Sequence, residues 1–230
     1  MLTRDNIKAG IISSMVHTTR ASYKILTDEE RETSLRETLA VRPAEAGAAN
    51  DDVWVFAYGS LIWNPAIHTV ERRLARLEGF SRQYCLWSPG GRGSEEFPGL
   101  MLGLEPGGFC DGVVFRIDAA AAAEELDILW RREMVAGSYD PKWLPTRTDA
   151  GGVHAITFVI NRNSERYVAD IANDEVVERL ARAKGQLGSC AEYLFNTVNH
   201  LRELGLDEQH LFQLADRVAD YRRIAGIADD

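Results

Sequence analysis

The stretch Val53-Trp54-Val55-Phe56-Ala57-Tyr58-Gly59-Ser60-Leu61 decides the fold of this chain. Its first six residues are apolar and mostly β-branched or aromatic, which is typical of a buried strand, and Gly59-Ser60 ends that strand. A glycine there allows a sharp turn and lets a ligand approach the backbone. Amides that leave a strand in such a turn can converge on an anion or an oxyanion. An ordinary strand-to-loop turn explains the same residues, so the pattern leaves both interpretations open.

More short strands are predicted beyond this stretch. Their segments are separated by clusters of Gly, Pro and Asp, which favour turns. We expect strands at 73–77, 83–87, 100–104, 112–117, 144–148 and 153–160, and one helix among them at 119–130. Many short strands with close turns indicate a barrel or a strongly bent sheet.

The hydrophobic period becomes helical from Asp174 onward. A first helix is expected to end at Gly185 or Gly188. Ser189 and Glu192 form a capping-box pair that opens a second helix, and Asp207 is expected to cap a third. The predicted fold class is therefore α+β, with a β-rich centre and a helical C-terminal third.

Residues 1–50 differ in pattern from the rest of the chain. Thr27 and Glu30 form a capping-box pair ahead of a short charged helix, which Arg42-Pro43 ends. We expect residues 1–50 to be an N-terminal appendage with one short helix, and residues 51–230 to form one domain.

Composition excludes several classes of protein. The chain has 230 residues and a net charge of -9, from 26 Lys and Arg against 35 Asp and Glu, which argues against a nucleic-acid-binding surface. No stretch approaches the ~20 apolar residues that a membrane span requires. The three cysteines have wide spacings that fit neither a disulfide framework nor a zinc site, which favours reduced thiols in a cytoplasm. No histidine pair at helical spacing indicates a metal site.

Three further segments are candidates for chemistry. Glu133 lies beside Trp130 and Met134, where desolvation would raise the pKa of its carboxyl as a general base requires, although a solvated helix end is the plainer interpretation. The segment Trp87–Gly93 is rich in glycine but lacks a nucleotide-binding motif. It is either a loop over a pocket, with Arg92 steering an anion, or an ordinary hairpin connection.

Cys190 is the third candidate, because it lies at a predicted helix start, which lowers the pKa of a thiol. His154 is a conceivable base for such a nucleophile. Free cysteines are more often buried filler, which is the competing interpretation.

Six blocks in chain order resemble the ChaC-like γ-glutamylcyclotransferases. They span most of the chain, and one small departure is Ala57, where many members have Gly. The blocks are 53–65, 79–84, 86–99, 112–116, 132–139 and 191–194.

The resemblance implies a small β-barrel with flanking helices, and an enzyme that converts glutathione to 5-oxoproline and cysteinylglycine without metal or organic cofactor. It implies that Glu133 is the catalytic acid and base. The turn residues Tyr58, Gly59, Ser60 and Leu61 would bind the γ-glutamyl group through backbone amides, at its α-carboxylate or at the oxyanion. Arg92 would accommodate the peptide carboxylate. Tyr193 either directs its hydroxyl into the pocket or is a core aromatic.

The resemblance also implies a small-molecule substrate. From the resemblance together with the charge, the hydropathy and the cysteines, we expect a cytoplasmic enzyme that acts as a monomer or weak homodimer, with no nucleic-acid or membrane partner. Three alternatives stay open. They are a cyclotransferase for other γ-glutamyl peptides or amines, a thiol-dependent enzyme that uses Cys190, and a non-catalytic γ-glutamyl or carboxylate-binding module.

Overall fold

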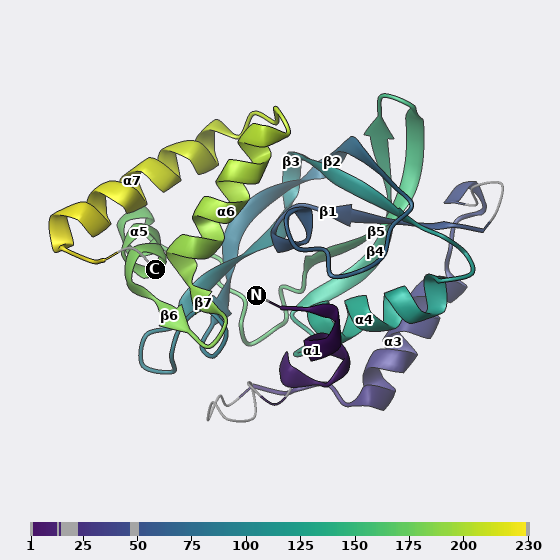
Figure 1. Cartoon of the computed structure of the whole chain (residues 1–230), viewed down its shortest axis with the longest axis horizontal. Coiled ribbons are helices and arrows are strands. Elements are labelled where there is room, and N and C mark those ends of the chain that lie inside the picture. Colours follow the sequence, from purple (N-terminus) through teal and green to yellow (C-terminus); the bar gives the residue numbers. More distant parts are fainter. Residues whose placement is uncertain (1, 13, 15–22, 47–50, 229–230) are drawn as a thin grey trace.

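The stretch that begins at Val53 becomes the first strand of a closed five-stranded barrel (Figure 1). In the computed structural model, which describes residues 2–12, 14, 23–46 and 51–228, β1 (Val53–Ala57) pairs antiparallel with β3 (Gly99–Ile117) and parallel with β5 (Gly151–Ile160). The other two strands are β2 (Glu71–Ser88) and β4 (Tyr139–Thr148), and the order around the barrel is β1-β3-β2-β4-β5. All five residues of β1 are buried, which explains why its sequence is continuously apolar instead of alternating.

Four of the predicted strands are halves of two longer strands. The segments 73–77 and 83–87 both lie in β2, and 100–104 and 112–117 both lie in β3. The β2–β3 ladder shifts register between Glu78 and Phe80, beside Gly79, whose φ of 82° is left-handed. Such irregularities bend and twist a strand without ending it. The glycine-rich breaks in the sequence were therefore wrongly interpreted as strand ends.

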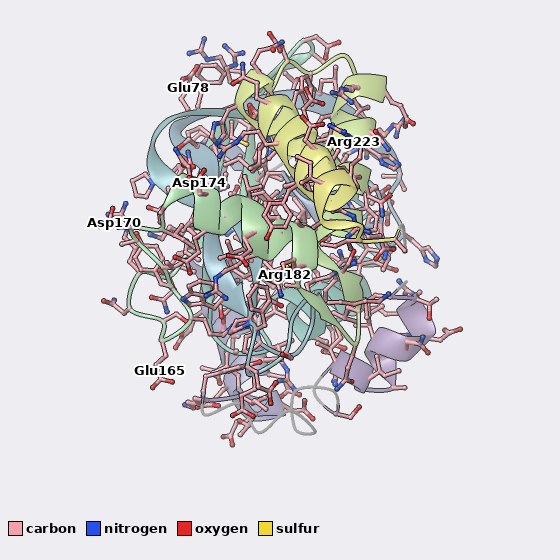
Figure 2. The ribbon with its side chains drawn as sticks, turned by 90° about the vertical axis from the view of Figure 1, so that its left-hand side faces the viewer. Glu78, Glu165, Asp170, Asp174, Arg182 and Arg223 are labelled. Carbon is pink, nitrogen blue, oxygen red and sulfur yellow. The ribbon has the colours of Figure 1, made fainter. Side chains whose placement is uncertain are left out.

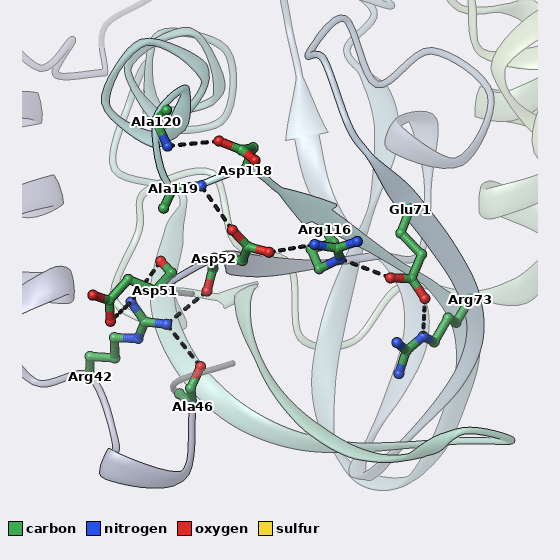
Figure 3. A network of polar contacts seen from close by, with 10 residues as sticks. All are labelled: Arg42, Ala46, Asp51, Asp52, Glu71, Arg73, Arg116, Asp118, Ala119 and Ala120. Carbon is green, nitrogen blue, oxygen red and sulfur yellow. Dashed lines mark hydrogen bonds and ion pairs between the residues drawn. The ribbon is translucent and has the colours of Figure 1, made fainter. Parts of the chain in front are cut away.

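A network of polar contacts centred on Asp52 fixes the start of β1 (Figure 3). Its Oδ1 accepts a hydrogen bond of 2.9 Å from the Ala119 amide, and its carboxylate forms an ion pair with Arg116 of β3. Arg116 also donates to Glu71 of β2 at 2.8 Å. Arg42 donates to the Asp52 carbonyl at 2.7 Å. Three segments that are distant in sequence are therefore tied to the same end of the barrel.

Three helices that precede β4 in the chain pack together on one side of the barrel (Figure 1). The helix α4 (Ala122–Glu133) begins and ends three residues later than predicted. Its Trp130 is buried, with its ring centroid 5.2 Å from that of Phe158 of β5. The predicted capping box at Thr27 is confirmed at the start of α3 (Asp28–Ala40), and a helix that the sequence did not indicate, α1 (Arg4–Lys8), precedes it. Both α1 and α3 contact α4.

The C-terminal helices lie on the opposite side of the barrel (Figure 1). They are α5 (Asn173–Arg182), α6 (Cys190–Glu203) and α7 (Gln209–Ala225), with the two-residue strands β6 (Lys184–Gly185) and β7 (Gly188–Ser189) between α5 and α6. In Figure 2, α7 crosses over α5, and charged residues such as Asp174, Arg182 and Arg223 lie on this outer side. The α+β class and the barrel with flanking helices are confirmed.

The ends of the C-terminal helices differ from expectation in two places. α5 ends at Arg182, ahead of both glycines that were expected to end it. Asp207 does not cap α7, which begins at Gln209 with Glu208 in the N-cap position. Ser189 does cap α6 as predicted, because its Oγ accepts from the Glu192 amide at 2.9 Å. Within the described residues, no helix is long and apolar enough to cross a membrane.

Candidate active site

The turn after β1 is held in place by a buried arginine, Arg82. Gly59 precedes a single turn of 3-10 helix, Ser60–Ile62, in which the Ile62 amide donates to the Gly59 carbonyl at 2.9 Å. Arg82 of β2 donates to the Tyr58 carbonyl at 2.5 Å and to the Asp111 carbonyl at 2.6 Å, and it forms an ion pair with Glu208. The turn therefore has a fixed position at the rim of the barrel.

Glu133 lies at the end of α4 and meets this turn through its neighbour. Arg132 Nε is 3.0 Å from Glu133 Oε1, and Arg132 Nη2 donates to Ser60 Oγ at 2.8 Å. Only 16% of the Glu133 side chain is exposed. Burial raises the pKa of the Glu133 carboxyl, and the Arg132 guanidinium opposes that rise. Burial lowers the pKa of Arg132, because the charged form loses its hydration.

Tyr193 approaches the turn from α6. Its side chain is buried, and its hydroxyl lies beside Gly59. Its ring packs edge-on against Trp63, with 6.3 Å between the ring centroids. Burial raises the pKa of the Tyr193 hydroxyl, and the Glu133 carboxylate raises it further. The hydroxyl therefore stays protonated near neutral pH and can act as a hydrogen-bond donor.

Arg92 reaches the same place from the loop that connects β2 and β3. Its guanidinium donates to the Ser189 carbonyl at 3.0 Å and forms an ion pair with Glu192, and it lies 5.7 Å from the Tyr193 ring centroid. The loop is fixed against the β6–β7 hairpin, since the Leu187 amide donates to the Gly91 carbonyl at 2.8 Å. The glycine-rich segment is thus a hairpin connection that also places Arg92 at a pocket.

These elements enclose a cavity of about 130 Å³ between the barrel rim, α4 and α6. Four of the predicted site residues line it together: Ser60, Arg92, Glu133 and Tyr193. The side chains of the predicted residues Tyr58 and Leu61 lie in the core instead. Tyr58 donates to the Phe158 carbonyl at 2.9 Å inside the barrel, and neither Tyr58 nor Leu61 is among the residues that line the cavity. Gly59 contributes by leaving room for the Tyr193 hydroxyl.

Other lining residues were not singled out from the sequence. Some fall inside the blocks of resemblance, which was the available signal for them: Trp63, Asn64, Arg132 and Glu192. Met101 and Leu187 carry no chemical signal. Leu2 and Ile12 come from the N-terminal segment, where no pattern indicated a role.

Cys190 does not have the environment of a nucleophile. It is fully buried, its thiol donates to the Arg92 carbonyl at 3.1 Å, and it accepts from the Leu100 amide at 3.3 Å. Burial raises the pKa of the thiol to about 11, although it lies at a helix start. His154 lines a different pocket, together with Trp54 and Arg73. These contacts agree with the interpretation of Cys190 as a buried filler residue and not with the alternative of a nucleophile with a lowered pKa. In the part of the chain that the structure describes, no three His, Cys, Asp or Glu residues group as metal ligands.

Comparison with known proteins shows the family and the fold of the chain. A family model described as ChaC-like protein matches residues 53–221. The glutathione-specific gamma-glutamylcyclotransferase of Escherichia coli (strain K12) is 39% identical over 187 residues, which cover 81% of this chain and 79% of that protein. The glutathione-specific gamma-glutamylcyclotransferase 1 of Danio rerio is 27% identical over 181 residues, which cover 76% of this chain and 92% of that protein. A crystal structure of a glutathione-specific gamma-glutamyl cyclotransferase from yeast has a TM-score of 0.69 at 22% identity, covers 74% of this chain and 96% of its own, and shows the same fold.

Proposed function

Because the chain belongs to the ChaC-like family, we propose that it is a glutathione-specific γ-glutamylcyclotransferase that releases 5-oxoproline and cysteinylglycine. The observation that carries the proposal is the buried Glu133 carboxylate, which has a raised pKa and lines the same cavity as Ser60 and Tyr193. A site that only binds its ligand has no need of a buried base. This feature therefore favours catalysis over a binding module.

The proposed reaction is an intramolecular transfer. The α-amine nitrogen of the γ-glutamyl group attacks its own γ-carbonyl carbon and closes a five-membered lactam. Ring closure of this kind has a high effective molarity, so the site mainly has to fix the folded conformer and move protons. Glu133 takes the proton from the attacking amine. The bond from the γ-carbon to the cysteinyl nitrogen then breaks, and Glu133 returns the proton to that nitrogen.

The remaining predicted residues are proposed to hold the substrate. In the 3-10 turn, the amides of Ser60 and Leu61 precede the first internal hydrogen bond, so they are suited to receive the α-carboxylate or the oxyanion. The protonated Tyr193 hydroxyl is a second donor for the same group. Arg92 is proposed to bind the peptide carboxylate by donating hydrogen bonds to it, while it keeps its ion pair with Glu192.

The wider setting is also a proposal. The described cysteines are all free and buried, which suits a cytoplasm where glutathione is abundant. We expect a monomer or a weak homodimer, which light scattering after size-exclusion chromatography would determine.

The test is direct. Purified protein is incubated with glutathione, and 5-oxoproline and cysteinylglycine are quantified over time. Equal amounts of both products support the cyclotransferase, whereas free glutamate would indicate a hydrolase. The same assay with γ-glutamyl-alanine and γ-glutamyl-lysine separates a glutathione-specific enzyme from one with a broader range.

A further inference from the structure

Two residues of the cavity wall come from outside the segment that matches the family. Leu2 and Ile12 line the cavity together with Glu133 and Tyr193, whereas the family match begins at residue 53. Figure 1 shows the N-terminal end of the chain beside α1, between the barrel and the C-terminal helices. The N-terminal segment, residues 2–12, is therefore part of the pocket of this particular chain.

Contacts away from the cavity hold this segment in place. Ile7 on α1 is 1% exposed and packs in the main core. Arg4 lies 2.9 Å from Glu124 of α4 and also forms an ion pair with Glu125. The Glu125 side chain is 2% exposed and accepts from the His68 amide at 2.9 Å. Since α1 is fixed to α4, the residues on either side of it, Leu2 and Ile12, have fixed positions at the cavity.

A hydrogen-bonded path also joins the segment to the proposed base. Asn64 Nδ2 donates to the Leu2 carbonyl at 2.9 Å, and the Asn64 carbonyl accepts from Arg132. Arg132 in turn forms the ion pair with Glu133. The N-terminal segment and Arg132, the ion-pair partner of Glu133, are thus both hydrogen-bonded to Asn64.

We propose that Leu2 and Ile12 determine the size of the amine-side group that a γ-glutamyl substrate can carry, an inference that rests on the proposed function. The ionised α-amino and α-carboxylate groups of the γ-glutamyl part need polar partners, which the barrel rim and α4 supply. Leu2 and Ile12 offer only apolar contact, so they face the part of the substrate that is released. Because both side chains line the cavity, we expect them to exclude bulky S-alkyl groups.

The experiment compares kcat/KM for glutathione and S-hexylglutathione in the full chain. Leu2→Ala and Ile12→Ala are expected to raise the ratio in favour of S-hexylglutathione about tenfold or more, because a few methylene contacts decide fit in an apolar pocket. Ile11→Ala is the matched control, since Ile11 packs on the core but does not line the cavity, and it is expected to leave the ratio unchanged. Ile12→Trp is expected to raise KM for glutathione about tenfold. A thermal melt of each variant establishes that it is folded. Because Leu2 is only half-buried, we expect Leu2→Ala to destabilise the fold less than Ile12→Ala does.

An unchanged ratio in both Leu2→Ala and Ile12→Ala overturns the proposal, as does an equal change in Ile11→Ala. Failure of the proposed function has a different signature, which is a wild-type protein that forms no 5-oxoproline from glutathione. Calorimetric titration of the same variants with glutathione and with S-hexylglutathione then measures the effect of Leu2 and Ile12 on the relative affinities of the two compounds. Relative affinities that the variants do not change, or the lack of any binding, overturn the proposal in that case.

Discussion

The hydroxyl oxygen of Tyr193 lies against the α-carbon of Gly59, so closely that a β-carbon on residue 59 would be 2.8 Å from it. Any larger residue at position 59 would therefore displace the Tyr193 hydroxyl. This contact joins the turn after β1 to α6, and it makes the glycine a requirement of the site as well as of the turn.

Gly59→Ala is therefore expected to lower kcat/KM for glutathione about 10²-fold, since a displacement of about 1 Å can have that effect. It is also expected to lower the melting temperature. Adding Tyr193→Phe removes the clashing oxygen, so the double variant should melt above Gly59→Ala alone, with a coupling of about 0.5–3 kcal/mol. Strictly additive melting shifts would contradict the contact.

Glu133→Gln keeps the shape of the side chain and removes the base. We expect 5-oxoproline release from glutathione to fall by about 10²–10⁴-fold, the usual effect of losing a general acid–base group. Glutathione binding, measured by calorimetry, should change much less. Asp127→Asn, whose side chain is 42% exposed on the same helix, is the control for a lost charge on α4 and should retain activity. Near-normal turnover in folded Glu133→Gln would remove the assignment.

The pH dependence of the reaction should report the Glu133–Arg132 pair. Activity needs the ionised carboxylate, so kcat/KM for glutathione should fall as the pH drops through the pKa of Glu133, which burial holds above its usual 4.5. Arg132 favours the ionised form and opposes that rise. Arg132→Met removes this stabilisation, so the acid limb should move to higher pH, whereas Arg132→Lys should move it less. An acid limb at the same pH in all three proteins would show that this carboxyl does not control the rate.

Cys190→Ala separates the cyclotransferase from a thiol-dependent enzyme. Since the thiol is buried with a pKa of about 11, we expect activity within about twofold of wild type and a destabilisation of about 1 kcal/mol from the small cavity. Turnover and urea unfolding are measured on the same preparation. Activity that disappears in a folded Cys190→Ala protein would favour the thiol mechanism.

Asp52→Asn tests the network at the start of β1. The ion pair with Arg116 and the hydrogen bond from Ala119 lower the pKa of Asp52, so the carboxylate stabilises the fold at a pH above the pKa of the unfolded chain, about 3.9. At pH 7 we expect the variant to lose about 1–2 kcal/mol of unfolding free energy, as for a hydrogen bond to a charged group. The difference from wild type should shrink as the pH falls below about 4, because Asp52 is then protonated in the unfolded chain, and it should vanish once the native carboxylate, whose pKa is lower, is protonated as well. Urea midpoints at pH 7, 4 and 3 measure this, and a constant difference would contradict it.

Local sequence was sufficient to predict the elements that are specified by residues close together in the chain. The strand at Val53–Ala57, the capping box at Thr27 and the N-cap at Ser189 are of this kind, because neighbouring residues specify them. The glycine bend in β2 was misinterpreted, since Gly79 interrupts the pattern in the same way whether a strand ends or bends.

The site residues also differ in how far local sequence could predict them. Glu133, Ser60, Arg92 and Tyr193 were predicted because they lie in motifs that resemble a family, and they do line one cavity. Their neighbours depend on contacts between distant segments. Leu2 is held at the cavity by such contacts, among them the ion pair of Arg4 with Glu125 and the hydrogen bond from Asn64 to the Leu2 carbonyl, and no periodicity in the first residues indicates them.

The parallel pairing of β1 with β5 has a consequence for how the protein is made. Val55 lies beside Ile156, so the barrel closes only when a growing chain has delivered β5 past the ribosome exit. The turn and the base, Ser60 and Glu133, emerge earlier, while Tyr193 emerges later still. Pairing across so much chain is slow, and β1 is an unprotected, wholly apolar edge during the wait. A nascent chain paused before residue 150 should therefore attract chaperones, and its cavity is complete only after Tyr193 has emerged.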